Sequence, residues 1–137
     1  MRLKTTLALL ALACALPARP APPAAPPETA QLQGRYDLWQ DGDGGPLCHV
    51  TLGGTPTLGG QALRADADCA RKLGLAGDPY AWFMAPDGRL VIIDAARQPL
   101  LRMERLGDPR QREFKDRRAG DYNNAVLLTP ATPITTK

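Results

Sequence analysis

The chain has 137 residues and a formal net charge of +3, with a single histidine, His49, and no serine. This length favours one domain. The lack of serine excludes a Ser-His-Asp hydrolase, and the single histidine excludes the HExxH motif of zinc proteases. Because an active site needs several polar groups that converge on one pocket, the composition favours a small binding protein over an enzyme.

The N-terminal segment is predicted to be an export signal, the signal peptide spanning residues 1–18. Arg2 and Lys4 precede a Leu/Ala-rich run of about a dozen residues, whereas a membrane-spanning helix needs about 20. Two processing routes stay open. Cleavage after Ala18 would release the protein into the periplasm, and acylation of Cys14 in an imperfect lipobox would anchor it to the outer membrane.

The signal peptide also carries much of the excess positive charge. Its removal lowers the number of basic residues from 17 to 15, against 14 acidic residues. The basic residues that remain are scattered among acids, which excludes nucleic acid as the partner. The most basic segment, residues 110–118, is interpreted as a solvated strand face and not as a phosphate site.

The two cysteines of the mature chain, Cys48 and Cys69, form an even count in an exported protein, which predicts one disulfide. Closing a loop of about 22 residues would stabilise the fold by roughly 3 kcal/mol in the chain-entropy model. The alternative, two free thiols or a metal site, lacks the CxxC or histidine spacing of a metal centre. No metal or cofactor is therefore expected.

Residues 19–33 are predicted to be a Pro/Ala-rich trunk or linker. The prolines at residues 19–27 (RPAPPAAPP) lack amide donors and have a fixed φ, so this stretch should be extended and semi-rigid. The stretch at residues 28–34 is expected to form a short helical turn before the folded domain begins.

From residue 34 to residue 130, turn signals recur every 8 to 12 residues, a spacing typical of all-β domains. The pattern predicts one short helix at residues 69–75. A loop bounded by Gly53-Gly54-Thr55-Pro56 and Gly59-Gly60 is expected after the second strand, and residues 131–137 are expected to form a disordered tail. Since the spacing between strands leaves no room for βαβ units, we expect an eight-stranded antiparallel up-and-down β-barrel. The eight predicted strands cover residues 35–40, 47–53, 62–67, 80–85, 90–94, 100–106, 112–117 and 125–129.

Three further features have simple structural interpretations. Asp41-Gly42-Asp43 is predicted to be a hairpin turn, because a calcium loop would need a downstream glutamate. His49 falls on the strand face opposite Cys48 and should face solvent or a partner. Trp82 is expected to pack in the core or at the barrel end, not to stack on a ligand.

Several short motifs occur in an order that resembles the bacterial AprI/Inh family of metalloprotease inhibitors, which includes outer-membrane lipoproteins. The opening LQGRYDL at residues 32–38 resembles the family's L-x-G-x-W/Y-x-L. CHVTL at residues 48–52 resembles C-x-[IV]-x-L, and the second cysteine and Leu73 follow. Trp82, then PDGRL at residues 86–90 and Asp94, complete the series, so the resemblance extends over nearly the whole mature domain.

The resemblance implies a barrel with one disulfide and a trunk that enters the active-site cleft of a secreted serralysin-type zinc protease. In the family, the free α-amino group and the first carbonyl approach the zinc ion and displace its catalytic water. For this chain the resemblance implies a monomer that inhibits the protease in a 1:1 complex in the periplasm. The trunk residues expected to bind the protease are Arg19, Pro20, Ala21, Pro22, Glu28, Thr29 and Leu32.

An alternative function depends on the processing of Cys14. Acylation would leave no free amine to reach a zinc ion and would place the protein on the outer membrane. It would then be a lipid-anchored barrel lipoprotein with a structural, small-ligand or broader protease-inhibitory role. A small-ligand role would need an open, apolar barrel interior.

Overall fold

The structure is a computed structural model, which describes residues 17–18, 27–42, 44–116 and 125–131. The predicted signal sequence up to residue 16, the proline-rich residues 19–26 and the tail from residue 132 lie outside the described residues, as does Asp43.

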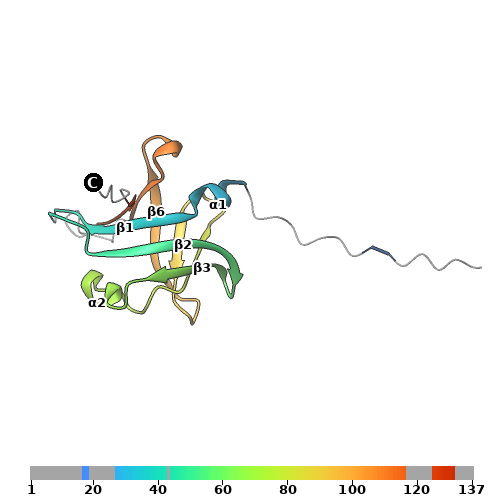
Figure 1. Cartoon of the computed structure of the whole chain (residues 1–137), viewed down its shortest axis with the longest axis horizontal. Coiled ribbons are helices and arrows are strands. Elements are labelled where there is room, and N and C mark those ends of the chain that lie inside the picture. The colour runs from blue at the N-terminus through green and yellow to red at the C-terminus, as the bar shows by residue number, and fades with distance from the viewer. Residues whose placement is uncertain (1–16, 19–26, 43, 117–124, 132–137) are drawn as a thin grey trace, which may run out of the picture.

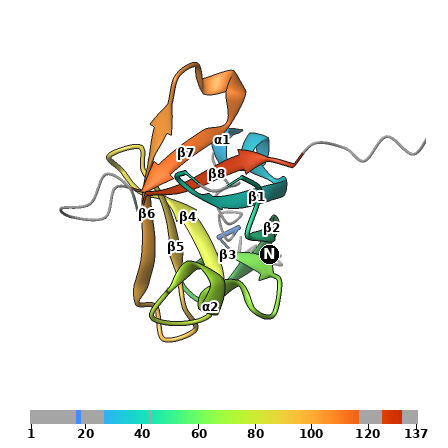
Figure 2. The ribbon, with the colours of Figure 1, turned by 90° about the vertical axis from the view of Figure 1, so that its left-hand side faces the viewer.

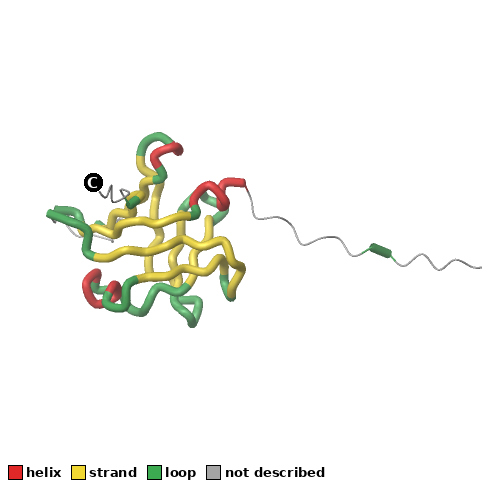
Figure 3. Tube along the Cα trace, in the orientation of Figure 1, coloured by secondary structure: helices red, strands yellow, loops and turns green. Residues whose placement is uncertain are grey.

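Eight antiparallel strands form a closed barrel in which each strand pairs with its neighbours in sequence and β8 pairs with β1 (Figures 1 and 2). The predicted all-β, up-and-down barrel is confirmed. Figure 3 shows how little of the domain is helical. The strands are β1 (Gly34–Gln40), β2 (Cys48–Thr57), β3 (Gly60–Ala65), β4 (Ala81–Met84), β5 (Leu90–Ile93), β6 (Pro99–Leu106), β7 (Glu113–Asp116) and β8 (Val126–Pro130).

The described residues also form three short helices: α1 (Pro27–Leu32), α2 (Cys69–Leu73) and the 3-10 turn η1 (Pro109–Gln111). The expected helical turn ahead of residue 34 corresponds to α1. The helix predicted at residues 69–75 forms but ends earlier, because Gly74 adopts a left-handed conformation (φ 61°) that terminates α2.

β2 departs from its predicted length. The strand was expected to end in a Gly-Gly-Thr-Pro loop, but it continues to Thr57. A register shift between Leu52 and Pro56 absorbs the irregular residues as a bulge, and Pro56 still pairs with Gln61 on β3. The prediction that the strand ends at these residues was therefore wrong, because a bulge lets glycine and proline remain in a strand near the end of a barrel.

The barrel interior is filled by the inward-facing side chains of all eight strands. Along β2, buried Cys48, Val50 and Leu52 alternate with the more exposed His49 and Thr51, as expected for a sheet with one face in the core. In the described part of the chain these side chains are buried and packed together in one cluster, whereas a small-ligand role would need an open lumen. The inward-facing core residues include Tyr36, Leu38, Leu63, Trp82, Leu90, Ile92, Leu101, Met103, Phe114, Val126 and Leu128.

The two α-helices close opposite ends of this core. Leu32 of α1 lies next to the start of β1, and Leu73 of α2 lies near Cys48, which pairs with Leu38 towards the other end of β1. Both leucines belong to the same buried cluster as the barrel interior. The segment that precedes β1 is thus part of the folded domain from Pro27 onwards (Figure 1).

A second, smaller cluster lies on the outer face of β4 and β5. Ala81, Val91 and Ile93 are buried there, although their neighbours in sequence face the barrel interior. The tip of the β2–β3 hairpin packs against this face. Gly59 at the tip has φ +86°, and a Cβ at this position would come within 2.5 Å of the Ile93 Cδ1 atom. Glycine is therefore needed at residue 59 for both its conformation and the close approach.

None of the helices in the described part of the chain combines the length and the hydrophobicity that crossing a bilayer requires.

Candidate functional site

The candidate site is the end of the barrel that carries α1, which forms the last part of the predicted trunk. Leu32 is 2% exposed and Thr29 6% exposed, so one face of α1 is buried. The hydroxyl of the fully buried Tyr36 donates a hydrogen bond of 2.7 Å to the carbonyl oxygen of Leu32. This bond satisfies one of the carbonyls that a helix leaves unpaired at its C-terminus.

Burial raises the pKa of Tyr36 above its ordinary value, and the nearby Arg112 and Arg105 partly oppose this shift. The neutral hydroxyl is the form that can donate to the Leu32 carbonyl. The environment of the ring therefore favours the protonation state that holds α1 in place.

A second contact joins α1 to the wall of the barrel. The Arg105 guanidinium, on β6, donates to the carboxylate of Glu28 in the first turn of α1. It also donates to the carbonyl oxygen of Pro109 (3.2 Å) and stacks over the Phe114 ring, 5.0 Å from the centroid. Since the Arg105 side chain is only 19% exposed, these contacts hold it in one place and attach the start of α1 to β6.

The structure separates the predicted trunk residues into two groups. Thr29 and Leu32 are buried and hold α1 on the barrel, and Glu28 is paired with Arg105 at the surface. Arg19, Pro20, Ala21 and Pro22 lie outside the described residues, as does Cys14. Thr29 and Leu32 therefore anchor α1 on the barrel, and Glu28 lies on the exposed side of the helix.

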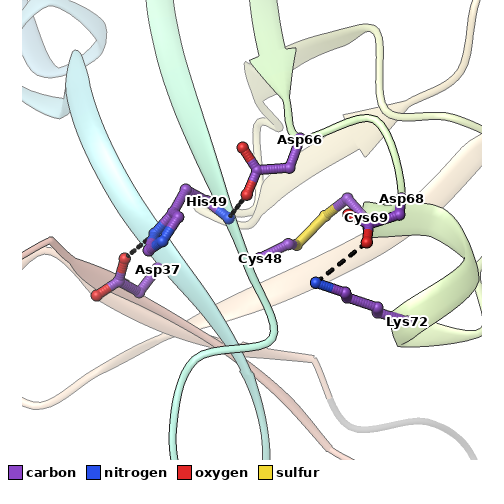
Figure 4. The surroundings of a disulfide bond; sticks show 7 residues. All are labelled: Asp37, Cys48, His49, Asp66, Asp68, Cys69 and Lys72. Atoms are coloured by element: carbon purple, nitrogen blue, oxygen red, sulfur yellow. Dashed lines mark hydrogen bonds and ion pairs between the residues drawn. A yellow bond between two sulfur atoms is a disulfide. The ribbon is translucent and has the colours of Figure 1, made fainter.

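The predicted disulfide between Cys48 and Cys69 is present and joins β2 to the first residue of α2 (Figure 4). Their Cα atoms are 5.4 Å apart, and both residues are buried. The alternative of free thiols is therefore excluded. Among the residues that the structure describes, no three His, Cys, Asp or Glu side chains are grouped so that they could hold a metal ion.

The side chain of His49 lies on the outer wall beside this disulfide (Figure 4). Its Nδ1 atom is 2.5 Å from Oδ1 of Asp37, and its backbone amide donates to the carboxylate of Asp66 (2.9 Å). The His49 side chain is 41% exposed, which confirms the prediction that it faces away from the core. His49 thus connects three neighbouring segments on the outer surface: β1, β2 and the residue that follows β3.

The other residues interpreted from the sequence have structural roles. Trp82 is fully buried, and its indole nitrogen donates to the carbonyl oxygen of Gly53 (3.0 Å), so its prediction as a core residue is confirmed. Asp41 lies in the turn after β1, where its carboxylate accepts a hydrogen bond from Nζ of Lys115 (2.8 Å). That contact makes Lys115 part of the framework and not of a free basic face.

Sequence reasoning missed the contacts that hold α1. Tyr36 was part of the motif that resembled the family, but no role was assigned to it. Arg105 was not singled out at all, because it lies 77 residues from Glu28 and no local pattern connects them. The one sequence feature that pointed to a role for Glu28 was its position as an acidic residue in the first turn of an expected helix.

A barrel with a packed core that holds a short helix at one end can serve as a scaffold that presents a binding surface. The sequence model of the family described as protease inhibitor Inh matches residues 26–123. The chain therefore belongs to this family, and it is a protease inhibitor and not an enzyme.

A solved structure agrees with this assignment at the level of the fold. The crystal structure of a psychrophilic marine protease MP inhibitor is 22% identical and superimposes with a TM-score of 0.56. The similarity covers 76% of this chain and 99% of that chain. A search of curated proteins gave no match.

Proposed function

We propose that this inhibitor acts in the periplasm on a secreted serralysin-type zinc metalloprotease, with its trunk in the active-site cleft of the enzyme. One observation carries the proposal: α1 is held on the barrel by the buried Leu32, by the Tyr36 hydroxyl and by Arg105. A trunk attached to such an anchor starts from a defined place on a compact body, which lowers the entropy lost on binding.

The chemistry of the trunk suits a zinc cleft. A catalytic zinc ion keeps one coordination position open for water or substrate. After cleavage behind Ala18, the α-amino group of Arg19 would be free, and an amine of pKa about 8 can bind zinc once it is deprotonated. The prolines of residues 19–27 restrict the backbone and remove amide donors, so they limit both the entropy cost and productive binding as a substrate.

Titration of a serralysin-type protease with the mature protein tests this function. We expect complete inhibition at one equivalent, which would establish the 1:1 complex. A variant that lacks residues 19–26 should fold but lose inhibition. A variant with one extra glycine before Arg19 should be weakened by about tenfold or more, equivalent to about 1.4 kcal/mol, because the amine is displaced from the zinc. Equal potency of all three proteins would refute the mechanism.

The route of export determines which N-terminus exists in the cell. Cleavage after Ala18 leaves a free amine, whereas acylation of Cys14 would block it and attach the protein to the outer membrane. Mass spectrometry of the intact protein, purified from the cell envelope, separates the two routes. A mass increase from acyl chains would refute zinc ligation by the amine and would leave inhibition through the barrel surface.

A further inference from the structure

A groove of about 510 Å³ runs beside α1, between this helix and the connection from β6 to β7. Residues of α1 form one wall, and residues of β6 and of the connection to β7 form the rest. The lining residues are Glu28, Gln31, Leu32, Arg105, Pro109, Arg110 and Arg112. The lining thus contains three guanidinium groups and one carboxylate. Because α1 directly follows residues 19–26 in the chain, the groove lies where this segment joins the folded domain.

Within the described part of the chain, two of the three guanidinium groups have no carboxylate partner. Arg105 is paired with Glu28, but Arg110 and Arg112 form no ion pair with any residue that the structure describes. The nearby carboxylate of Asp108 accepts a hydrogen bond from the backbone amide of Arg110 (2.9 Å), and the neighbouring Glu113 pairs with neither arginine.

Arg112 is the more unusual of the two. Its guanidinium lies over the ring of Tyr36, 5.9 Å from the centroid, and the residue is half-buried. Its φ of 54° is in the left-handed region, which is unfavourable for a residue other than glycine. Arg112 ends η1 in this conformation, and its half-buried guanidinium has no carboxylate partner among the described residues, so it can accept a negatively charged group from a ligand.

A neighbouring hollow serves as an internal comparison. It lies between the β4–β5 turn and β6 and contains two arginines, Arg89 and the shared Arg105. Arg89 is paired with Glu104 (3.0 Å) and lies 3.8 Å from Asp87, and Arg105 is paired with Glu28. The charges of that hollow are balanced within the chain. The groove beside α1 therefore differs from that hollow by Arg110 and Arg112, which have no carboxylate partner among the described residues.

We infer that the groove beside α1 binds a carboxylate side chain of the target protease, held by Arg110 and Arg112. This inference rests on the proposed function, because the trunk brings the enzyme to this end of the barrel. The planar guanidinium group matches a carboxylate in shape and charge, and such pairs set the orientation and the association rate of a complex. The groove would thus be a second contact that the trunk alone does not provide.

The test compares two variants that lose the same charge. Arg110→Gln/Arg112→Gln removes two positive charges from the groove, and Arg71→Gln/Lys72→Gln removes two from α2, at the opposite end of the barrel. At about 50 mM salt, the inhibition constant of the groove variant should rise by about tenfold, and less at about 500 mM salt. The α2 variant should change by less than about twofold. The exposed Arg110→Gln variant alone should show part of the effect even if loss of Arg112 disturbs the packing on Tyr36.

A measurement without the protease separates the two proposals. Fluorescence anisotropy of a labelled hexaglutamate peptide should report binding to the wild type and to the α2 variant but not to the groove variant. Equal behaviour of both variants in both assays, or no binding of the peptide to the wild type, would overturn the inference. If the peptide binds but no zinc protease is inhibited, the carboxylate site stands and its assignment to a metalloprotease falls.

Discussion

The hydroxyl group of Tyr36 offers the most direct test of how α1 is held. In a Tyr36→Phe variant the ring still fills the core, but the 2.7 Å hydrogen bond to the Leu32 carbonyl is lost. A net hydrogen bond is worth about 1 kcal/mol, and a buried acceptor left unpaired costs about 1–3 kcal/mol. We therefore expect the free energy of unfolding to fall by about 1–3 kcal/mol, and the melting temperature by about 4–8 °C per kcal/mol.

Urea denaturation followed by circular dichroism measures this change, and Tyr80→Phe is the matched control. The Tyr80 hydroxyl lies 3.1 Å from Oγ1 of Thr57, but Tyr80 is 40% exposed, so water can replace that bond. The control should stay within about 0.5 kcal/mol of the wild type. If the two variants were equally stable, the Tyr36 hydroxyl would not hold α1, and the anchor would depend on Leu32 and Arg105 alone.

The same hydroxyl predicts a pH dependence. Because burial raises the pKa of folded Tyr36, the unfolded chain releases this proton at a lower pH than the folded protein does. Above about pH 10 the unfolded state therefore binds fewer protons, and stability falls as the pH rises. The stability contribution is complete below about pH 10. Tyr36→Phe should lack this part of the alkaline decline, so the difference in stability between wild type and variant should shrink above about pH 10.

Three other substitutions test the disulfide, the ion pair and the core. Replacing both Cys48 and Cys69 with alanine should cost about 3 kcal/mol in urea denaturation, because the closed loop no longer restricts the unfolded chain; a loss below about 1 kcal/mol would contradict this. Glu28→Gln should change stability by less than about 1 kcal/mol, because the Glu28 carboxylate is half-exposed. It should, however, speed amide hydrogen exchange in α1. Unchanged exchange would show that Arg105 does not hold the helix. Trp82→Ala should cost about 3–5 kcal/mol in thermal unfolding, because it leaves a cavity in the core.

The sequence by itself determined the fold class and most of the strands. Alternation of buried and exposed residues is a local property with a period of two, so a strand such as β2 can be recognised without its partners. Turns are also local. In Pro86-Asp87-Gly88, the glycine adopts φ 83° and its amide donates to the Ala85 carbonyl (2.9 Å). The disulfide was predicted by assigning Cys14 to the expected signal peptide, which leaves Cys48 and Cys69 as the one possible pair.

Contacts between distant segments depended on closure of the barrel and could not be predicted from local sequence patterns. The continuation of β2 through its bulge depends on pairing with β3, and the burial of Leu32 depends on the core that all eight strands enclose. Glu28 and Arg105 are 77 residues apart, and they meet because the barrel brings β6 beside the helix that precedes β1. Contacts between distant segments follow from how the chain closes in three dimensions. For that reason the anchor of α1 and the groove of arginines beside it emerged from the tertiary structure alone.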